Sequence, residues 1–302
     1  MRPEKALDAI NRRFGSHGAR ALHAKGTLLK GRFTATPAAA ALTRAQHMQG
    51  EPVDATVRVS NGSGDPHAPD YGPEVRGMAV KFYLPDGSRT DISAQTVPRF
   101  PVRTPDAFIN LIRASAPGPS RAWRLPFFLA THPEALPALR ANAPALKPPA
   151  SYATCRYYAV HAFKWIDADG GSRYVRYTWV PEATEPPLSA EEARSRGADY
   201  LQDDIAARLP VRFTLQLQIA VGGDKVDDPT AVWPPERDTV DAGTLELTAL
   251  ETGREKDGDV LVFDPVRVAD GIETSEDPIL RYRSPAYSVS VERRSGVAPG
   301  GK

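Results

Sequence analysis

Alternation of apolar and polar residues recurs along this chain and constrains its fold more than any other feature. It is seen in TVRVSNG (56–62), GMAVKFYL (77–84), YVRYTWV (174–180), RFTLQLQIAV (212–221) and TLELTAL (244–250). A period of two, with β-branched and aromatic residues, predicts strands that bury one face. Turn signals at 85–87, 167–171 and 221–225 predict tight connections between neighbouring strands. The pattern indicates an antiparallel sheet that closes into a barrel.

Helical patterning fills the stretches between these strands. The clearest case is 189–209, where Ser189 is followed three residues later by Glu192, the spacing of a capping box. Further helices are expected at about 104–116 and near 275–287. The proline-rich stretch 116–149 carries large apolar residues at helical spacing, so we expect broken helices packed over the barrel. The predicted fold class is α+β, with an antiparallel β-barrel core and flanking α-helices.

Size, charge and cysteine usage narrow the function class. The chain has 302 residues, enough for one large domain or two ordinary ones, and a net charge of +1. Such a balance lacks the one-signed surface of proteins that bind nucleic acid or membranes, so we expect a small-molecule partner. Cys155 stands alone, which excludes an internal disulfide and favours a reducing compartment. Since neither a secretory signal nor a membrane span is evident, we expect a cytoplasmic protein.

A histidine stands within the strand-like run RALHAKGTLLKGRF, residues 20–33. His23 has Arg20 before it and Lys25 after it. It could be a catalytic base, a metal ligand or a polar residue placed in a sheet. A lone histidine is more often structural than catalytic, and its neighbours leave these three alternatives open.

A second motif is RYRSPAY, residues 281–287, inside an expected helix. Arg283 and Tyr287 are four residues apart and therefore share one helix face. Tyrosine is neutral in water at pH 7, but a guanidinium one turn away favours the phenolate, which can bind ferric haem iron. An arginine stacked on an aromatic ring is the alternative, and the spacing alone does not decide between them.

Both motifs belong to a longer ordered set. The set comprises His23–Gly26 (HAKG) with 31–33 (GRF), 58–60 (RVS), 76–83 (RGMAVKFY), 160–170 (VHAFKWIDADG), 231–235 (AVWPP) and 263–278 (FDPVRVADGIETSEDP). With these blocks in this order, the sequence resembles the haem catalase family over nearly its whole length. The resemblance implies a catalase-like barrel that binds haem b, as a single domain over 1–302.

The resemblance also implies a role for each matching position. His23 matches the distal histidine, which moves a proton between the two oxygens of bound peroxide, and Ser60 matches the serine that orients its ring. Tyr287 matches the proximal iron ligand, and Arg283 the arginine that keeps it ionised. Other matching positions are Arg20, Arg58 and Arg294 for the haem propionates, Leu22 and Phe108 for the distal pocket, and His161 for the proximal side, where a structural role stays open.

Two features depart from the family pattern. Where catalases have D-L-V-G-N-N-T-P, with a distal asparagine, this chain has DISAQTVP at 91–98. Gln95 falls on the asparagine and keeps the amide donor, but its extra methylene shifts that donor by roughly an ångström. If the register slips by one residue, Thr96 occupies the position. The chain is also too short for the family's N-terminal arm, wrapping segment and C-terminal helical domain, so we expect a more accessible haem.

These departures favour peroxidase activity over dismutation. We expect a minimal catalase-related peroxidase that reduces hydrogen peroxide or organic hydroperoxides with a small-molecule electron donor. The alternatives are a true catalase, an enzyme that rearranges or isomerises fatty-acid hydroperoxides, and a non-catalytic haem carrier. No nucleic-acid or membrane partner is expected. A homodimer is expected, because the apolar proline-rich segment needs more cover than one chain supplies.

Overall fold

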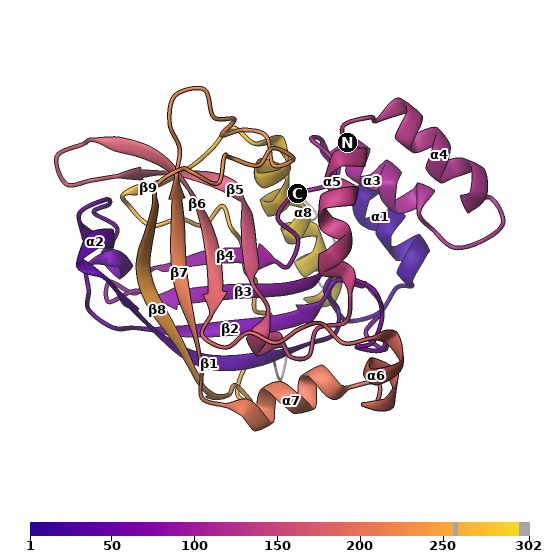
Figure 1. The fold of residues 1–302 in the computed structure, drawn as a ribbon, viewed down its shortest axis with the longest axis horizontal. Coiled ribbons are helices and arrows are strands. Elements are labelled where there is room, and N and C mark those ends of the chain that lie inside the picture. Colours follow the sequence, from indigo (N-terminus) through magenta and orange to yellow (C-terminus); the bar gives the residue numbers. More distant parts are fainter. Residues whose placement is uncertain (256–258, 296–302) are drawn as a thin grey trace.

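Eight strands close into an antiparallel barrel in this computed structural model, which describes residues 1–255 and 259–295 (Figure 1). The strands are β1 (Gly26–Ala35), β2 (Val53–Asn61), β3 (Arg76–Tyr83), β4 (Arg89–Gln95), β5 (Tyr157–Ile166), β6 (Ser172–Pro181), β7 (Val211–Ile219) and β8 (Thr239–Leu250). They follow the order β4-β3-β2-β1-β8-β7-β6-β5, and the pairing of Gln95 with Tyr158 closes the ring. The short β9 (Ile272–Thr274) pairs with β5. The predicted antiparallel barrel is confirmed.

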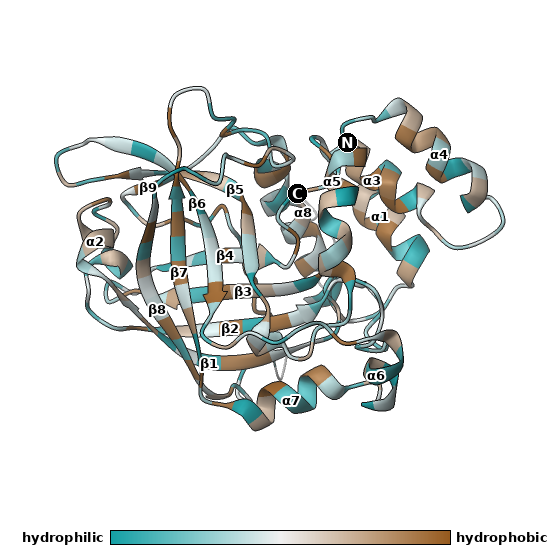
Figure 2. Cartoon of the chain, in the orientation of Figure 1, coloured by the Kyte–Doolittle hydropathy of each residue, from teal (hydrophilic) through white to brown (hydrophobic). Residues whose placement is uncertain are grey.

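Side-chain packing fills the interior of the barrel. In β1, Leu29 and Phe33 are fully buried, whereas Lys30 and Arg32 between them are exposed. Apolar and polar residues alternate in this way along the strands in Figure 2. Phe33 meets the ring of Phe82 edge-on at a centroid distance of 5.3 Å. Burial of a phenylalanine contributes roughly 1.5–3 kcal/mol, so this packing stabilises the barrel that positions the site.

Three helices from distant parts of the sequence pack together beside the barrel. They are α1 (Pro3–Phe14), α3 (Pro105–Ala114) and α8 (Pro278–Ser295). Ile10 of α1 and Ile112 of α3 belong to one buried cluster, against which Val289 of α8 packs. The remaining helices are α2 (Pro37–Ala40), α4 (Arg121–Thr131), α5 (Ala135–Asn142), α6 (Ala190–Ser195) and α7 (Tyr200–Arg208), with 3-10 turns η1 (Gln46–Met48), η2 (Ala143–Leu146) and η3 (Tyr152–Thr154). Within 1–255 and 259–295, no helix combines the length and apolar character needed to cross a bilayer.

The helix predictions hold with two corrections to their bounds. The capping box at Ser189 is present, but the expected helix 189–209 is two helices, α6 and α7. Gly197 separates them because its φ of +99° is a left-handed conformation that an α-helix does not continue through. The helix expected near 275–287 begins only at Pro278, where Asp277 accepts a 2.8 Å hydrogen bond from the backbone N–H of Ile279.

Two of the three predicted tight turns join adjacent strands. The segments 85–87 and 167–171 connect β3 to β4 and β5 to β6. The prediction for 221–225 is wrong, because β7 ends at Ile219 and β8 begins only at Thr239. The long connection folds back on the barrel and buries Trp233, whose ring lies under the Arg176 guanidinium at 4.5 Å. A cation–π contact of this kind stabilises the connection.

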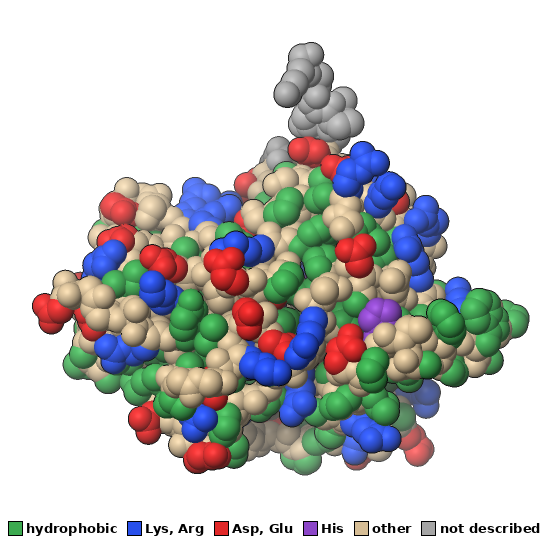
Figure 3. Space-filling model, turned by 90° about the horizontal axis from the view of Figure 1, so that it is seen from above, with side chains coloured by type: hydrophobic (Ala, Val, Ile, Leu, Met, Phe, Trp, Pro, Cys, Tyr) green, Lys and Arg blue, Asp and Glu red, His purple; other side chains and the backbone are tan. Residues whose placement is uncertain are grey.

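The proline-rich stretch 116–149 forms broken helices, as predicted, but its first helix, α4, lies away from the barrel (Figure 1). α4 packs against α3 instead, and its Phe128 is buried in the same cluster as Ala107. Its outer face leaves Trp123 and Phe127 64% and 65% exposed. Figure 3 shows hydrophobic side chains gathered at the end of the molecule that α4 forms. The homodimer expected from this segment stays a prediction.

Candidate active site

A cavity of about 540 Å³ lies between β2, β3 and β4 on one side and α1, α3 and α8 on the other. Its walls are mostly apolar, with Ile10, Phe108 and Ile112 among the lining residues. Every residue predicted for the site lines it except His161: Arg20, Leu22, His23, Arg58, Ser60, Gln95, Phe108, Arg283, Tyr287 and Arg294. The fold therefore brings together residues from both ends of the chain.

His23 lies in the loop before β1, not in a strand, so its placement within a sheet is ruled out. Its φ of +55° is unusual for a residue with a side chain. The conformation is held by a 2.8 Å hydrogen bond that the Arg58 guanidinium donates to the carbonyl of His23. Nδ1 of the ring is 3.1 Å from Oγ of Ser60. These contacts fix both the backbone and one ring nitrogen.

The electrostatic environment keeps the His23 ring neutral. Burial, reinforced by the positive charges of Arg58, Arg283 and Arg20, lowers its pKa from 6.5 to about 3. At neutral pH the imidazole is therefore uncharged and has a nitrogen able to accept a proton. This is the state that a general base requires.

A single row of the barrel carries the polar residues around His23. Across β2, β3, β4 and β5, Ser60 pairs with Gly77, Gly77 with Gln95, and Gln95 with Tyr158. Gln95 lines the cavity, and its buried Nε2 has no hydrogen-bond partner among the described residues. Thr96 instead accepts a 3.1 Å hydrogen bond from the backbone N–H of Arg76. The register thus puts Gln95, rather than Thr96, at the cavity. We call His23, Ser60, Gly77 and Gln95 the His23 wall.

The opposite group of polar residues centres on α8. Nε of Arg283 donates a 2.9 Å hydrogen bond to the hydroxyl oxygen of Tyr287, and Nη1 of Arg283 lies 3.2 Å from Nε2 of His161. Nδ1 of His161 in turn lies 2.6 Å from Oδ2 of Asp277. We call these four residues the Tyr287 wall. His161 lies behind the cavity surface and connects the arginine to a buried carboxylate.

The partners of His161 define its tautomer. Burial lowers its pKa despite the nearby Asp277 carboxylate, so the ring is neutral. Asp277 can only accept, so Nδ1 carries the hydrogen and Nε2 accepts from the Arg283 guanidinium. The order of donors and acceptors therefore orients Arg283 toward Tyr287.

The guanidinium groups of Arg20, Arg58 and Arg294 lie close together at the cavity. Nη1 of Arg20 donates a 3.0 Å hydrogen bond to Glu255. Burial and then Arg20 lower the pKa of Arg58 to about 9 and also lower that of Arg294. Nε of Arg294 is buried without a partner among the described residues. Such a cluster fits a ligand that carries carboxylates.

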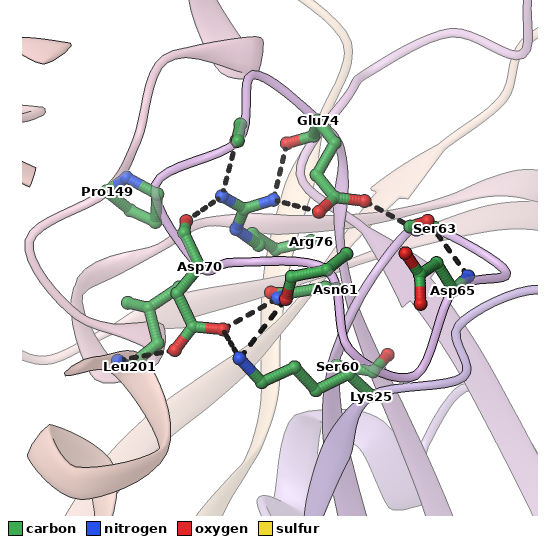
Figure 4. A network of polar contacts seen from close by, with 12 residues as sticks. Lys25, Ser60, Asn61, Ser63, Asp65, Asp70, Glu74, Arg76, Pro149 and Leu201 are labelled. Atoms are coloured by element: carbon green, nitrogen blue, oxygen red, sulfur yellow. Dashed lines mark hydrogen bonds and ion pairs between the residues drawn. The ribbon is translucent and has the colours of Figure 1, made fainter. Parts of the chain in front are cut away.

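A buried network anchors the loop of His23 to the rest of the molecule (Figure 4). The Asp70 carboxylate lies 2.8 Å from Nζ of Lys25, two residues after His23. It also accepts hydrogen bonds of 2.7 Å from the Asn61 side chain and 2.8 Å from the backbone N–H of Leu201. Asp70, Asn61 and Leu201 are buried, Lys25 is half-buried, and all four are paired, so the network restricts movement of the loop.

Sequence reasoning did not single out Asp277, Gly77 or Tyr158 as site residues. Asp277 has a recognisable signal, because an acidic residue just before a proline is typical of a helix start. Gly77 has another, because a glycine inside a strand pattern indicates close approach of a neighbouring group. Tyr158 also lines the cavity, and only its pairing with Gln95 reveals its place.

A closed antiparallel barrel with His23 and Tyr287 on one cavity is the arrangement of a catalase-type protein. A fungal catalase structure superposes with a TM-score of 0.80 at 25% identity, over 97% of this chain and 62% of that chain. The sequence model of the family described as Catalase matches residues 16–299. This chain belongs to the catalase family.

Two relatives are similar over nearly their whole length. A catalase-related peroxidase from Mycolicibacterium paratuberculosis is 50% identical over 99% of this chain and 97% of the relative. A catalase-related peroxidase from Synechococcus elongatus is 33% identical over 97% of this chain and 88% of the relative. The potato (Solanum tuberosum) catalase isozyme 2 is 29% identical, and the match spans 60% of its length. The chain is thus closer in length to the first two proteins.

Proposed function

We propose that this protein is a haem peroxidase that reduces hydrogen peroxide or organic hydroperoxides with a small-molecule electron donor. The observation that carries the proposal is the pair of His23, neutral and half-buried, and Tyr287, hydrogen-bonded to Arg283, on one cavity. Membership of the catalase family implies haem. The names of the two similar-length relatives support peroxidase activity.

The residues present fit haem b, which combines an apolar ring with two carboxylates. The apolar walls suit the ring, and Arg20, Arg58 and Arg294 suit the carboxylates. The buried Nε of Arg294 has no partner within 1–255 and 259–295, which supports this assignment, because such a donor needs an acceptor. Tyr287 would bind the iron through its oxygen, with Arg283 stabilising the anionic form. Bound haem supplies the iron and the electrons that break the O–O bond.

The chain's own residues manage the protons. Nδ1 of His23 is engaged with Ser60, so Nε2 is the nitrogen that takes a proton from the peroxide and returns it to the departing oxygen. Nε2 of Gln95, which is without a partner in the described part of the chain, supplies a hydrogen-bond donor for the peroxide. Reduction of each peroxide consumes two electrons from the donor and two protons. Hydrogen peroxide yields two molecules of water, and an organic hydroperoxide yields one alcohol and one water.

Peroxidase activity is favoured over dismutation for a steric reason. Dismutation needs a second hydrogen peroxide held tightly at the same face, and the longer Gln95 side chain puts the amide in a different place from the family's asparagine. The approach of an electron donor has no such requirement. A single domain over 1–302 and a cytoplasmic location complete the proposal.

Parallel measurement of oxygen evolution and donor oxidation tests the function. We expect the haem-loaded protein to oxidise a dye donor in proportion to the peroxide consumed, with little oxygen released. His23→Ala should abolish most of this activity, whereas His67→Ala, at an exposed position, should not. Rapid oxygen release with negligible dye turnover would identify a catalase instead. Loss of a lipid hydroperoxide without any reductant would identify a rearranging enzyme.

A further inference from the structure

Gly77 occupies the centre of the His23 wall, between Ser60 and Gln95 in the barrel row. A Cβ at this position would lie 2.7 Å from Nδ1 and 2.8 Å from Cε1 of His23, and 2.9 Å from Oγ of Ser60. Optimal contacts of carbon with other heavy atoms are about 3.5–4 Å, so even one methyl group would overlap the ring. The imidazole therefore lies where a side chain of residue 77 would be.

The backbone gives no other reason for a glycine here. Gly77 lies within β3, pairs regularly on both sides and is not among the glycines with positive φ. Glycine weakens a strand, because it has more freedom to lose and no side chain to pack. Its neighbours in β3 are buried residues with full side chains, Arg76 and Met78. The space taken by His23 is what distinguishes position 77.

We propose that Gly77 is a positioning residue for His23: the missing side chain forms a slot that holds the imidazole against Ser60. The slot keeps Nδ1 of His23 beside Oγ of Ser60 and leaves Nε2 free for the peroxide. This inference rests on the proposed function, since it assigns the residue a purpose in proton transfer. In this role Gly77 acts through the ring of His23.

Coupled stability measurements test the slot independently of activity. The urea midpoints of four full-length proteins would be compared: wild type, Gly77→Ala, His23→Ala and the double variant. We expect Gly77→Ala to lower the midpoint when His23 is present and to have little effect when residue 23 is alanine, because the overlapping ring is gone. The remaining contact with Ser60 Oγ is relieved by rotation about its χ1.

Gly222→Ala is the matched control. Gly222→Ala has no atom within 4 Å of its new Cβ and no positive φ, so it should leave the midpoint unchanged in both backgrounds. An equal loss of stability from Gly77→Ala with and without His23 would overturn the proposal. If Gly77→Ala alone does not fold, recovery of folding in the double variant supports the slot and its absence contradicts it.

Kinetics of the haem-loaded protein test the purpose of the slot. In stopped-flow mixing with hydrogen peroxide, Gly77→Ala should react about a hundredfold more slowly at unchanged haem content, because the base is displaced. Ser60→Ala and Gly77→Ala should be non-additive, since both act through the orientation of one ring. A Gly77→Ala protein as fast as wild type, or fully additive effects, would contradict the positioning role. If the wild-type protein does not react with peroxide, the proposed function is wrong. The urea midpoints still test whether Gly77 forms the slot.

Discussion

The His23 wall and the Tyr287 wall differ in how they position their main side chain: uncharged groups position the ring of His23, and a guanidinium positions the hydroxyl of Tyr287. The His23 ring is held by neutral contacts, namely the hydroxyl of Ser60 and the space left by Gly77. Tyr287 is held at the end of a series of ionisable groups that runs back to the carboxylate of Asp277. A base must be uncharged before it acts, whereas an anionic ligand needs a fixed cation beside it. Desolvation thus favours the neutral ring of His23, whereas the proposed iron ligand Tyr287 depends on the Arg283 cation beside it.

Removal of the base should have the largest effect. We expect His23→Ala to slow the reaction with hydrogen peroxide by about 10²–10⁴-fold, because the proton then has no positioned acceptor. Haem content should stay near that of wild type, since the Tyr287 wall is untouched. Stopped-flow absorbance and a haem assay measure the two quantities. Equal loss of haem and rate would show that the walls are not separable.

Removal of the cation beside Tyr287 should produce the contrasting result. Arg283→Met should weaken haem binding by about 10–100-fold, the usual cost of losing a group that supports a metal ligand. Titration of the apoprotein with haem measures this affinity. Arg281→Met provides a matched control, because Arg281 is exposed and pairs with Glu276 on the surface. A similar loss from both variants would attribute the effect to helix stability rather than to Tyr287.

The comparison between the walls also separates what the sequence predicts from what it does not. Period-two alternation predicted the strands, because burial of one face leaves a local signature. The motifs predicted His23 and Tyr287, but the contact of His161 with Asp277 joins residues 116 positions apart, and no local pattern encodes it. Gln95 and Thr96 could be distinguished only by the register of β4 on β3. The break at Gly197 was missed because the helical pattern continues on both sides of it.

The carboxylate behind His161 should have a smaller effect. Asp277→Asn keeps the cap on α8 but removes the acceptor that fixes the His161 tautomer, so Arg283 is oriented less well. We expect haem affinity to fall by about tenfold, the lower end of the range for such supporting groups. Haem titration checks the value. An effect larger than that of Arg283→Met would mean that Asp277 acts by some other route.

Acid should destabilise the apoprotein through histidines that the fold keeps as neutral rings. Burial lowers the pKa of His47 to about 4, and burial with nearby arginines lowers that of His23 to about 3. Both values lie below the ordinary 6.5, so the unfolded chain binds more protons as pH falls below about 6.5. Unfolding free energy should therefore decrease from that pH toward pH 4, by up to about 1.4 kcal/mol per pH unit for His47. Urea titrations of wild type and His47→Phe would measure it, and identical pH slopes would contradict the assignment.

A crystal structure of the haem-loaded protein tests the proposed site most directly. We predict iron bonded to the oxygen of Tyr287, with His23 on the other face of the ring and not bonded to the metal. Propionates should lie against Arg20, Arg58 and Arg294. Iron held by a different side chain, or a cavity that stays empty in the presence of excess haem, would contradict the assignment of both walls.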